Sequence, residues 1–237
     1  MTRIGFEDRA SLQSLSAEGL LTWALDEFGD EVSLACSFGA EDVVLVDMLC
    51  RLTSKPRVFA IDTGRLHEAT YEVMERIREK YGLDLDIYFP SRGEVERLVS
   101  EKGLYSFRTS LDGRKECCRI RKVEPLGRAL KGLKAWITGL RRDQSITRTE
   151  VAKVEVDDAH GGIVKLNPLA DWSSEAVWEY IRANDVPYNA LHDVGYPSIG
   201  CEPCTRAVKP GEHPRAGRWW WENPVDKECG LHVEERK

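Results

Sequence analysis

The chain has 237 residues, of which 42% are hydrophobic, and its 34 Lys and Arg against 40 Asp and Glu give a formal net charge of -6 at pH 7. This size suits one sizeable core with a small appendage, and the negative balance argues against general binding of nucleic acid, so any anion site must come from local clusters of basic side chains. No apolar run approaches membrane-spanning length and the first ten residues have no apolar core, so we expect a soluble, cytoplasmic protein.

The first half of the chain alternates predicted helices with predicted strands. Apolar residues recur there either at helical spacing or in short runs bounded by turn residues. This order predicts an α/β fold with a mostly parallel sheet, helices on both faces, and ligands at the carboxyl ends of the strands. The predicted helices cover residues 20–28, 42–52, 68–81 and 94–100, and the predicted strands cover residues 32–36, 57–62, 85–89 and 134–139.

Three turns follow these strands at what should be one edge of the sheet. Residues 37–42 place a serine and a glycine just before a helix, where backbone N–H groups can bind a phosphate, although such turns are as often purely structural. Residues 61–64 offer backbone groups and a hydroxyl, and residues 139–148 bring three arginines. Together the three turns predict a nucleotide pocket.

The second half is less regular. Residues 151–156 and 162–166 alternate like a hairpin at the sheet margin, and a serine-capped helix should cover residues 173–184. Residues 186–200 should form a loop. Three consecutive tryptophans, residues 219–221, would be unfavourable in water, so this tail should dock on the folded part of the chain.

Four cysteines are paired in a way that suits a soft metal centre. Cys117 and Cys118 are adjacent, Cys201 and Cys204 have the C-x-x-C spacing, and basic residues lie near both pairs. Neighbouring cysteines bind one zinc ion awkwardly, whereas each can bind a different iron of a 4Fe-4S cluster, so the cluster is favoured over zinc. A vicinal disulfide or four unrelated buried thiols are the structural alternatives, and an odd total of seven cysteines fits a reducing compartment.

A further cysteine, Cys229, lies close to the carboxyl terminus. Gly230 follows it and would allow close approach of a ligand, and His232 lies three residues beyond the cysteine. An incidental exposed thiol is the alternative. The position favours a nucleophile.

These motifs resemble one known family. The resemblance is to the assimilatory adenylyl-sulfate (adenosine 5'-phosphosulfate) reductases, which belong with the phosphoadenylyl-sulfate reductases in the adenine-nucleotide alpha-hydrolase group of folds, and it covers the chain from about Val32 onward. One departure is visible, because residues 36–39 read Cys-Ser-Phe-Gly where many members have Ser-Phe-Ser-Gly. The motifs that carry the resemblance are Cys117 and Cys118 with Arg121, Lys122, Pro125 and Leu126, then Cys201 and Cys204, Arg215, Arg218, residues 219–222 and residues 228–232.

The resemblance implies a role for each matching residue. It implies a 4Fe-4S cluster on Cys117, Cys118, Cys201 and Cys204, and Cys229 as the nucleophile. Residues around the phosphosulfate would be Lys122, Arg215, Arg218 and His232, and those that hold the adenosine and its phosphate would be Ser37, Gly39, Glu41, Thr63, Gly139 and Arg148.

The implied reaction is the thiol-dependent reduction of adenylyl sulfate to sulfite and AMP, in sulfate assimilation and cysteine biosynthesis. A thiosulfonate on Cys229 would be the intermediate, and reduced thioredoxin or glutaredoxin the reductant, because no second cysteine lies nearby to resolve it. We expect residues 1–204 to form a nucleotide-binding α/β domain with the metal site and residues 205–237 to form a catalytic tail. The oligomeric state stays open, a homo-oligomer included.

Three other functions remain open from the sequence. A phosphoadenylyl-sulfate reductase shares most of the motifs, although the cluster cysteines favour the substrate without the 3'-phosphate. An ATP pyrophosphatase-type sulfurtransferase would need a stronger phosphate loop than residues 37–42 and would leave Cys229 unexplained. A metal-bearing nucleic-acid-binding module is disfavoured by the negative charge and the lack of a continuous basic stripe.

Overall fold

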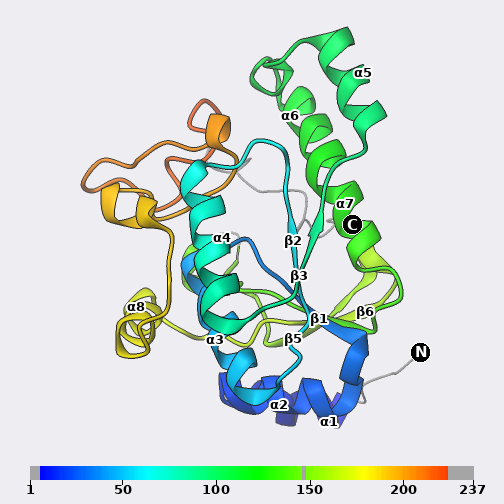
Figure 1. The fold of residues 1–237 in the computed structure, drawn as a ribbon, viewed down its shortest axis with the longest axis vertical. Coiled ribbons are helices and arrows are strands. Elements are labelled where there is room, and N and C mark those ends of the chain that lie inside the picture. The colour runs from blue at the N-terminus through cyan, green and yellow to red at the C-terminus, as the bar shows by residue number, and fades with distance from the viewer. Residues whose placement is uncertain (1–5, 146–147, 224–237) are drawn as a thin grey trace. The chain divides into compact units, whose positions relative to one another are not determined.

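The computed structural model describes residues 6–145 and 148–223 (Figure 1). The chain divides into two compact units, each built from several stretches of sequence. The first consists of Met1–Phe59, Glu72–Asp86 and Gly132–Asn189, and the second of Ala60–Tyr71, Ile87–Lys131 and Ala190–Lys237. The predicted boundary at residue 204 stays a prediction, and both sides of it belong to the second unit.

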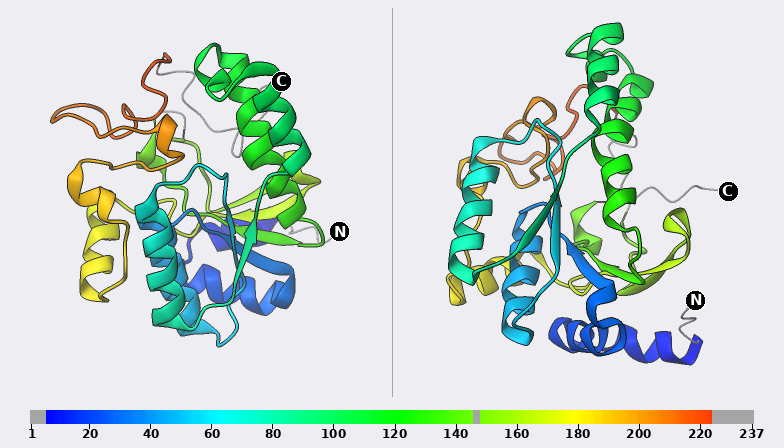
Figure 2. Two further views of the ribbon diagram at one scale, coloured as in Figure 1. Left: turned by 45° about the horizontal axis from the view of Figure 1, so that its top comes forward. Right: turned by 45° about the vertical axis from the view of Figure 1, so that its right-hand side comes forward.

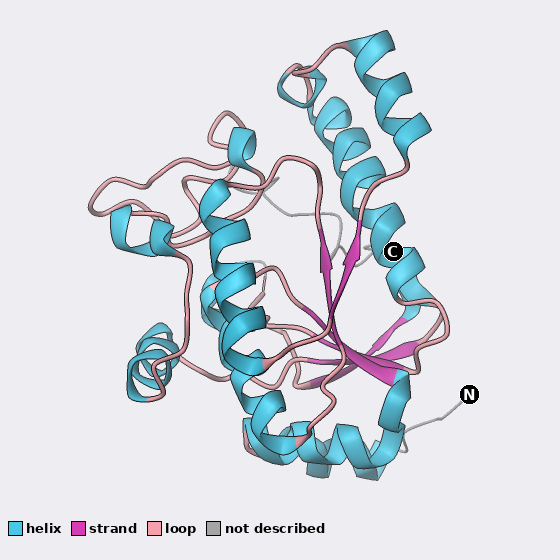
Figure 3. Cartoon of the chain, viewed as in Figure 1, coloured by secondary structure: helices cyan, strands magenta, loops and turns pink. Residues whose placement is uncertain are grey.

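The sheet has six strands in the order β3-β2-β1-β4-β6-β5 (Figure 3). β1 pairs in parallel with β2 and β4, β4 pairs in parallel with β6, and only β5 is antiparallel to its neighbour β6. The predicted α/β class with a mostly parallel sheet is therefore confirmed, and the predicted hairpin is the β5–β6 pair. The strands are β1 (Val32–Ala35), β2 (Val58–Ile61), β3 (Leu85–Tyr88), β4 (Ala135–Ile137), β5 (Val154–Asp157) and β6 (Ile163–Leu166).

Helices of the first unit cover the sheet with apolar faces. α2 (Ala17–Phe28) begins where the Ser16 hydroxyl accepts a hydrogen bond from the backbone of Gly19, and α2 and α3 (Ala40–Leu52) both pack against β1. α8 (Ser174–Ala183) packs against α3. The sequence predicted these three helices and α4 (Glu68–Tyr81), whereas α1 (Phe6–Gln13) was not predicted.

One buried carboxylate joins three of these helices. Asp47 of α3 accepts hydrogen bonds from the hydroxyl of Tyr81 at 2.8 Å and from that of Tyr180 at 2.7 Å, and it pairs with Arg51 at 2.9 Å. Burial and the hydrogen bond to Asp47 raise the pKa of both tyrosines, so both hydroxyls stay protonated as donors. The carboxylate is thus satisfied by groups from α4 and α8 as well as its own helix.

The second unit contains a helical stretch that the sequence analysis did not predict. α6 (Leu111–Cys118) continues through a π-helical turn (Arg119–Val123) into α7 (Glu124–Ala129), and α5 (Arg92–Lys102) contacts the π-helical turn (Figure 2). The predicted loop of residues 186–200 includes one short 3-10 turn, Ala190–Val194. In the described part of the chain, no helix is long and apolar enough to cross a membrane.

Candidate functional site

The first part of the candidate site lies in the first unit, where β1 and β4 end. β1 lies between β2 and β4 in the sheet. On one side of β1 the order continues with β2 and β3, and on the other side it continues with β4 and β6. In open α/β sheets, ligands bind at such a reversal, outside the carboxyl ends of the two adjacent strands. The turns after β1 and β4 are therefore the expected place for a nucleotide.

Asp42 joins these two turns. Its Oδ2 accepts hydrogen bonds from both the backbone N–H and the hydroxyl of Ser37, each at 2.6 Å. A Cβ at Gly139 would lie 2.3 Å from Asp42 Oδ1 and 2.9 Å from the Cβ of Glu41, so only glycine fits there. Burial raises the pKa of the Asp42 carboxyl to about 6, although the hydrogen bonds from Ser37 act in the opposite direction.

The start of α3 has the features of an anion site. Phe38 adopts the left-handed region with a φ of 58° while its side chain is buried. Gly39 then forms the N-cap of α3 without any side-chain hydrogen bond to the helix. Because this cap supplies no side-chain oxygen atom, the first N–H groups of α3 can bind a phosphate oxygen.

The remaining predicted nucleotide contacts of the first unit lie near these turns. Glu41 forms an ion pair with Arg141 at 2.8 Å, and Arg141 also donates to the carbonyl of Trp172. The Gln144 amide donates to the Gly139 carbonyl, and its oxygen accepts a hydrogen bond from Arg148. The structure thus brings the predicted residues of the first unit into two linked turns, and Arg141 is an addition that the sequence analysis did not name.

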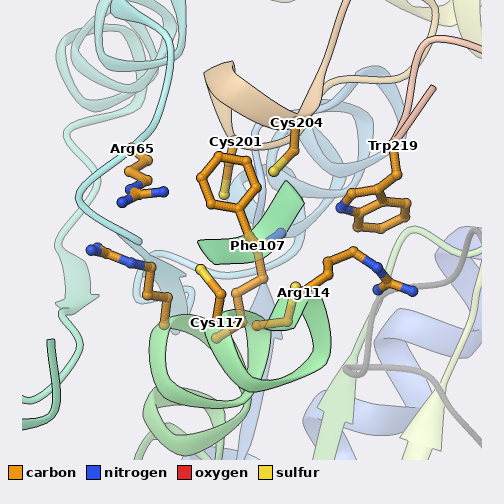
Figure 4. Close-up of a pocket in the computed structure, with 10 residues that line it drawn as sticks. Arg65, Phe107, Arg114, Cys117, Cys201, Cys204 and Trp219 are labelled. Carbon is orange, nitrogen blue, oxygen red and sulfur yellow. The ribbon is translucent and has the colours of Figure 1, made fainter. Parts of the chain in front are cut away.

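The second part of the candidate site is a cavity inside the second unit, which we call the four-thiol cavity (Figure 4). Its empty volume is ≈ 340 Å³, part of it open to solvent. The sulfur atoms of Cys117, Cys201 and Cys204 point into the same gap. Four cysteines and four cations are among the residues that line it: Arg65, Phe107, Arg114, Cys117, Cys118, Arg121, Lys122, Cys201, Cys204 and Trp219.

Half of the lining comes from one helical face. Residues 114, 117, 118, 121 and 122 follow one another at helical spacing of three and four residues, and they read Arg, Cys, Cys, Arg and Lys. The π-helical turn begins directly after Cys118. π-helical turns are rare and frequently occur at functional sites. This spacing was the signal that could have identified Arg114 and Arg121, because it places both on the face of the cysteines.

The turn after β2 contributes contacts to the same region. The Thr63 hydroxyl lies 3.3 Å from the sulfur of Cys201, and the Thr63 carbonyl accepts a hydrogen bond from Arg121 at 2.6 Å. Arg65 donates to the backbone of Leu104, and its guanidinium lies 4.9 Å from the centre of the Phe107 ring. Thr63, predicted as a nucleotide contact, therefore lies against a predicted metal ligand.

Burial disfavours the thiolate form of two cysteines of the cavity. Burial raises the pKa of Cys204 to about 12 and also raises that of Cys117, while nearby Arg and Lys side chains act in the opposite direction. All six cysteines in the described part of the chain are free thiols, and among described residues no three His, Cys, Asp or Glu side chains form a group that could hold a single metal ion. A metal bound here would have to displace protons.

The tryptophan segment docks beside the cavity. Trp219 is 1% exposed, and its ring lies between the guanidinium groups of Arg114 and Arg218, each 4.6 Å from the ring centre. Trp220 is 38% exposed, so the predicted burial of the three tryptophans holds for the first of them but not for the second. Arg218 is buried and donates to the Ile199 carbonyl, whereas Arg215 is partly exposed.

Two predicted residues lie outside the described part of the chain. These are Cys229, the predicted nucleophile, and His232. Lys122, the remaining predicted substrate contact, lines the four-thiol cavity.

Comparisons with known proteins identify the family of this chain. A family model described as phosphoadenosine phosphosulfate reductase domain matches residues 31–207. The chain belongs to this family. It is 52% identical over 229 residues to the adenosine 5'-phosphosulfate reductase of Pseudomonas aeruginosa strain LESB58, covering 94% of this chain and 85% of that relative. The resemblance expected from the sequence is therefore confirmed.

Solved structures agree with the family and the fold. The phosphoadenylyl-sulfate reductase of Candida auris, solved as a phosphate complex, is 31% identical with a TM-score of 0.74, covering 87% of this chain and 98% of that one. The NH3-dependent NAD synthetase of Campylobacter jejuni is 15% identical with a TM-score of 0.52, covering 80% and 79% of the two chains, and this likeness concerns the fold alone. The predicted adenine-nucleotide alpha-hydrolase-like fold is confirmed.

Proposed function

We propose that this protein is a reductase that converts adenylyl sulfate to sulfite and AMP at the expense of a dithiol, in sulfate assimilation. The observation that carries this proposal is the 52% identity to a relative named for adenosine 5'-phosphosulfate, over nearly the whole chain. The four-thiol cavity supports it, because the cavity holds every cysteine that the resemblance assigns to a cluster. The phosphoadenylyl-sulfate reductase is the second candidate, and the 31% identity to the Candida auris enzyme keeps it open.

The donor set of the cavity fits a 4Fe-4S cluster. Four cysteines face one cavity, and thiolates are the ligands that such clusters use. Arg65, Arg121 and Lys122 would compensate the negative charge of four thiolates. When bound, the cluster would supply a fixed charged centre that joins the helix of Cys117 and Cys118 to the segment of the other two cysteines. Zinc on the same thiols is the alternative.

The proposed chemistry begins with the thiolate of Cys229. It attacks the sulfur atom of the sulfonyl group, the bond from that sulfur to the phosphate oxygen breaks, and AMP leaves with the electron pair. Negative charge develops on the departing oxygen, and fixed cations stabilise it. We assign this role to Lys122, Arg215, Arg218 and His232.

The second step needs an external dithiol such as reduced thioredoxin or glutaredoxin. One of its thiolates attacks the Cys229 sulfur, sulfite leaves, and the second thiol of the reductant releases Cys229 as its own disulfide forms. Two electrons pass from the dithiol to sulfur, so the reaction balances. Such a thiol-dependent cycle suits a reducing compartment, and we propose a cytoplasmic location.

We assign the adenosine phosphate to the turns of the first unit. The open N-terminus of α3 suits the phosphate, and Gly139 lets the turn after β4 pack closely against Asp42 and Glu41 at the start of that helix. The predicted contacts in these turns are Ser37, Gly39, Glu41, Gly139 and Arg148, and Thr63 of the second unit stays a predicted contact as well.

The first prediction tests the nucleophile and the substrate together. Anaerobically prepared protein mixed with adenylyl sulfate and no thioredoxin should acquire a sulfonate on the Cys229 peptide, visible by mass spectrometry and removed by reduced thioredoxin as sulfite. Cys229→Ser should show no adduct, because a hydroxyl is far less nucleophilic than a thiolate at neutral pH. Cys50→Ser, which removes a partly exposed thiol of the first unit, is the matched control and should react like wild type.

The outcomes separate the candidates. An adduct on another cysteine, or turnover by the serine variant, would contradict the assignment of Cys229. A higher kcat/KM for the 3'-phosphorylated substrate would favour the second candidate.

A further inference from the structure

A buried ion pair between Arg114 and Glu222 connects the helix of the cavity to the tail. Arg114 Nε lies 2.8 Å from Glu222 Oε1, and the two side chains are 2% and 8% exposed. The other carboxylate oxygen, Oε2, is buried and has no hydrogen-bond partner among the described residues. Burying two charges costs desolvation energy, and apolar residues of similar volume often stabilise a fold equally well. Stability alone therefore does not account for this pair.

Further contacts fasten the same short segment. The Trp219 backbone N–H donates to the Cys204 carbonyl at 3.1 Å, and the Glu222 N–H donates to the Trp219 carbonyl at 2.9 Å. The Trp219 ring is stacked against the guanidinium of Arg114. Residues 219–222 are thus tied both to the C-x-x-C segment and to α6, which carries the other two cysteines.

Glu222 lies close in the sequence to Cys229, the proposed nucleophile. Cys229 lies seven positions further along the chain, and an extended chain of that length spans at most about 25 Å. Whatever conformation the intervening residues adopt, the place where Glu222 is held limits where the Cys229 sulfur can go. A nucleophile must approach the reacting atom to about 3–3.5 Å in the correct direction.

We propose that the Arg114–Glu222 ion pair is a positioning device for the nucleophile, because it fixes the point from which the catalytic tail leaves the cavity. The inference rests on the proposed function, in which Cys229 attacks the sulfonyl group. Arg114 and Glu222 are positioning residues, since they act through the tail. A directional pair serves this purpose better than apolar contact, because it fixes the orientation of the segment as well as its distance.

The test is a double-mutant cycle on the full chain. Arg114→Met and Glu222→Met each break the ion pair and leave one of its two buried charges in place, so both single variants should lose thermal stability. The double variant removes both charges and should recover it. Glu116→Met is the matched control, because it removes a more exposed ion pair, with Lys102, from the same helix.

Two measurements distinguish a positioning role of the ion pair from a purely structural one. Iron content and the visible spectrum report the metal site, and single-turnover sulfonation of Cys229 at several adenylyl sulfate concentrations gives the rate at saturation and the half-saturating concentration. The double variant should keep wild-type iron and half-saturation but react about tenfold or more slowly at saturation, since misplacement by about 1 Å can cost 10²-fold. The control should match wild type in every readout.

A double variant that regains both stability and the wild-type rate would overturn the proposal, because the pair would then be structural only. Glu222→Gln keeps the size and the acceptor oxygen of the glutamate, so it is the second test should the double variant fail to bind iron. A reduced saturating rate with intact iron supports the proposal, and an unchanged rate overturns it. Failure of the proposed function looks different, because wild type itself would then form no adduct on Cys229.

Discussion

Each of the two regions of the candidate site is held in place by its own kind of contact. The turns after β1 and β4 meet because the strands that precede them are neighbours in a parallel sheet. Asp42 accepts two short hydrogen bonds from Ser37 in the first turn and lies directly against Gly139 in the second. The four-thiol cavity has no such frame. Its lining comes from several separate segments, and cations, aromatic rings and one buried ion pair hold them around the thiols. The first region is therefore positioned by the sheet, whereas the second is positioned by side-chain contacts between separate segments.

The largest effect should come from removing one thiol of the cavity. Cys204→Ser takes away one of the four proposed ligands, so we expect iron and sulfide to fall to a small fraction of the wild-type content and sulfite formation to be lost with them. Because metal binding contributes to folding, the thermal unfolding temperature should fall as well. Metal analysis of anaerobically prepared protein measures the first effect and calorimetry the second.

The matched control is Cys36→Ser, which alters a buried thiol of the first unit and should keep its iron. Stoichiometric zinc without iron in the wild-type protein would contradict the cluster and favour the zinc alternative.

A second variant should break the other region and leave the cavity intact. In Gly139→Ala the new methyl group would lie 2.3 Å from Asp42 Oδ1, so the two turns must move apart. We expect the KM for adenylyl sulfate to rise about tenfold or more while iron content stays at the wild-type level. Steady-state kinetics and metal analysis on the same preparation measure both.

Gly93→Ala is its control. Gly93 lies in α5, and a Cβ there meets no atom within 4 Å, so this change should be neutral or slightly stabilising. A Gly139→Ala enzyme with wild-type KM would mean that the first region does not bind the substrate.

The smallest expected effect is a pH dependence of the free energy of unfolding, and it arises from Asp42 in the first region. Folding raises the pKa of Asp42 from 3.8 to about 6, so the unfolded chain loses this proton more readily than the folded one. Well below pH 3.8 the group is protonated in both states and costs nothing. As the pH rises from 3.8 to about 6 it destabilises the fold, by at most about 3 kcal/mol for this difference in pKa. Relative to Asp42→Asn, wild type should therefore lose stability across this window and no further above it.

Urea unfolding of both proteins between pH 4 and pH 8 measures that difference. A stability difference that does not vary with pH would show that the Asp42 carboxyl titrates in the folded state as it does in the unfolded chain.

The sequence predicted the sheet well because its strands are apolar and bounded by turn residues. The four strands predicted in the first half were found within two residues of their observed ends, and the cysteines that share the cavity were identified from residue type and spacing alone. The helix from Leu111 to Ala129 was missed for a physical reason. Its buried face near the cavity presents Arg114, Cys117, Cys118 and Arg121 instead of aliphatic residues, so it lacks the apolar periodicity by which helices are predicted.

Contacts between distant segments could not be predicted. Nothing in the local sequence links Arg114 to Glu222, which lie 108 residues apart, or Glu41 to Arg141. Such pairs depend on tertiary packing, and a single sequence does not report which charges are buried together. The same holds for Thr63, which was predicted to contact the nucleotide and lies beside Cys201.

Asp47 links the packing of α3 to the docking of α8. Its hydroxyl partners lie 34 and 133 residues away along the chain, so a newly collapsed α3 meets only Arg51 locally and must keep its carboxylate hydrated. Contacts at such separation form slowly because the intervening chain must first be brought together. Docking of α8, which delivers Tyr180, is therefore required before Asp47 has all three of its partners.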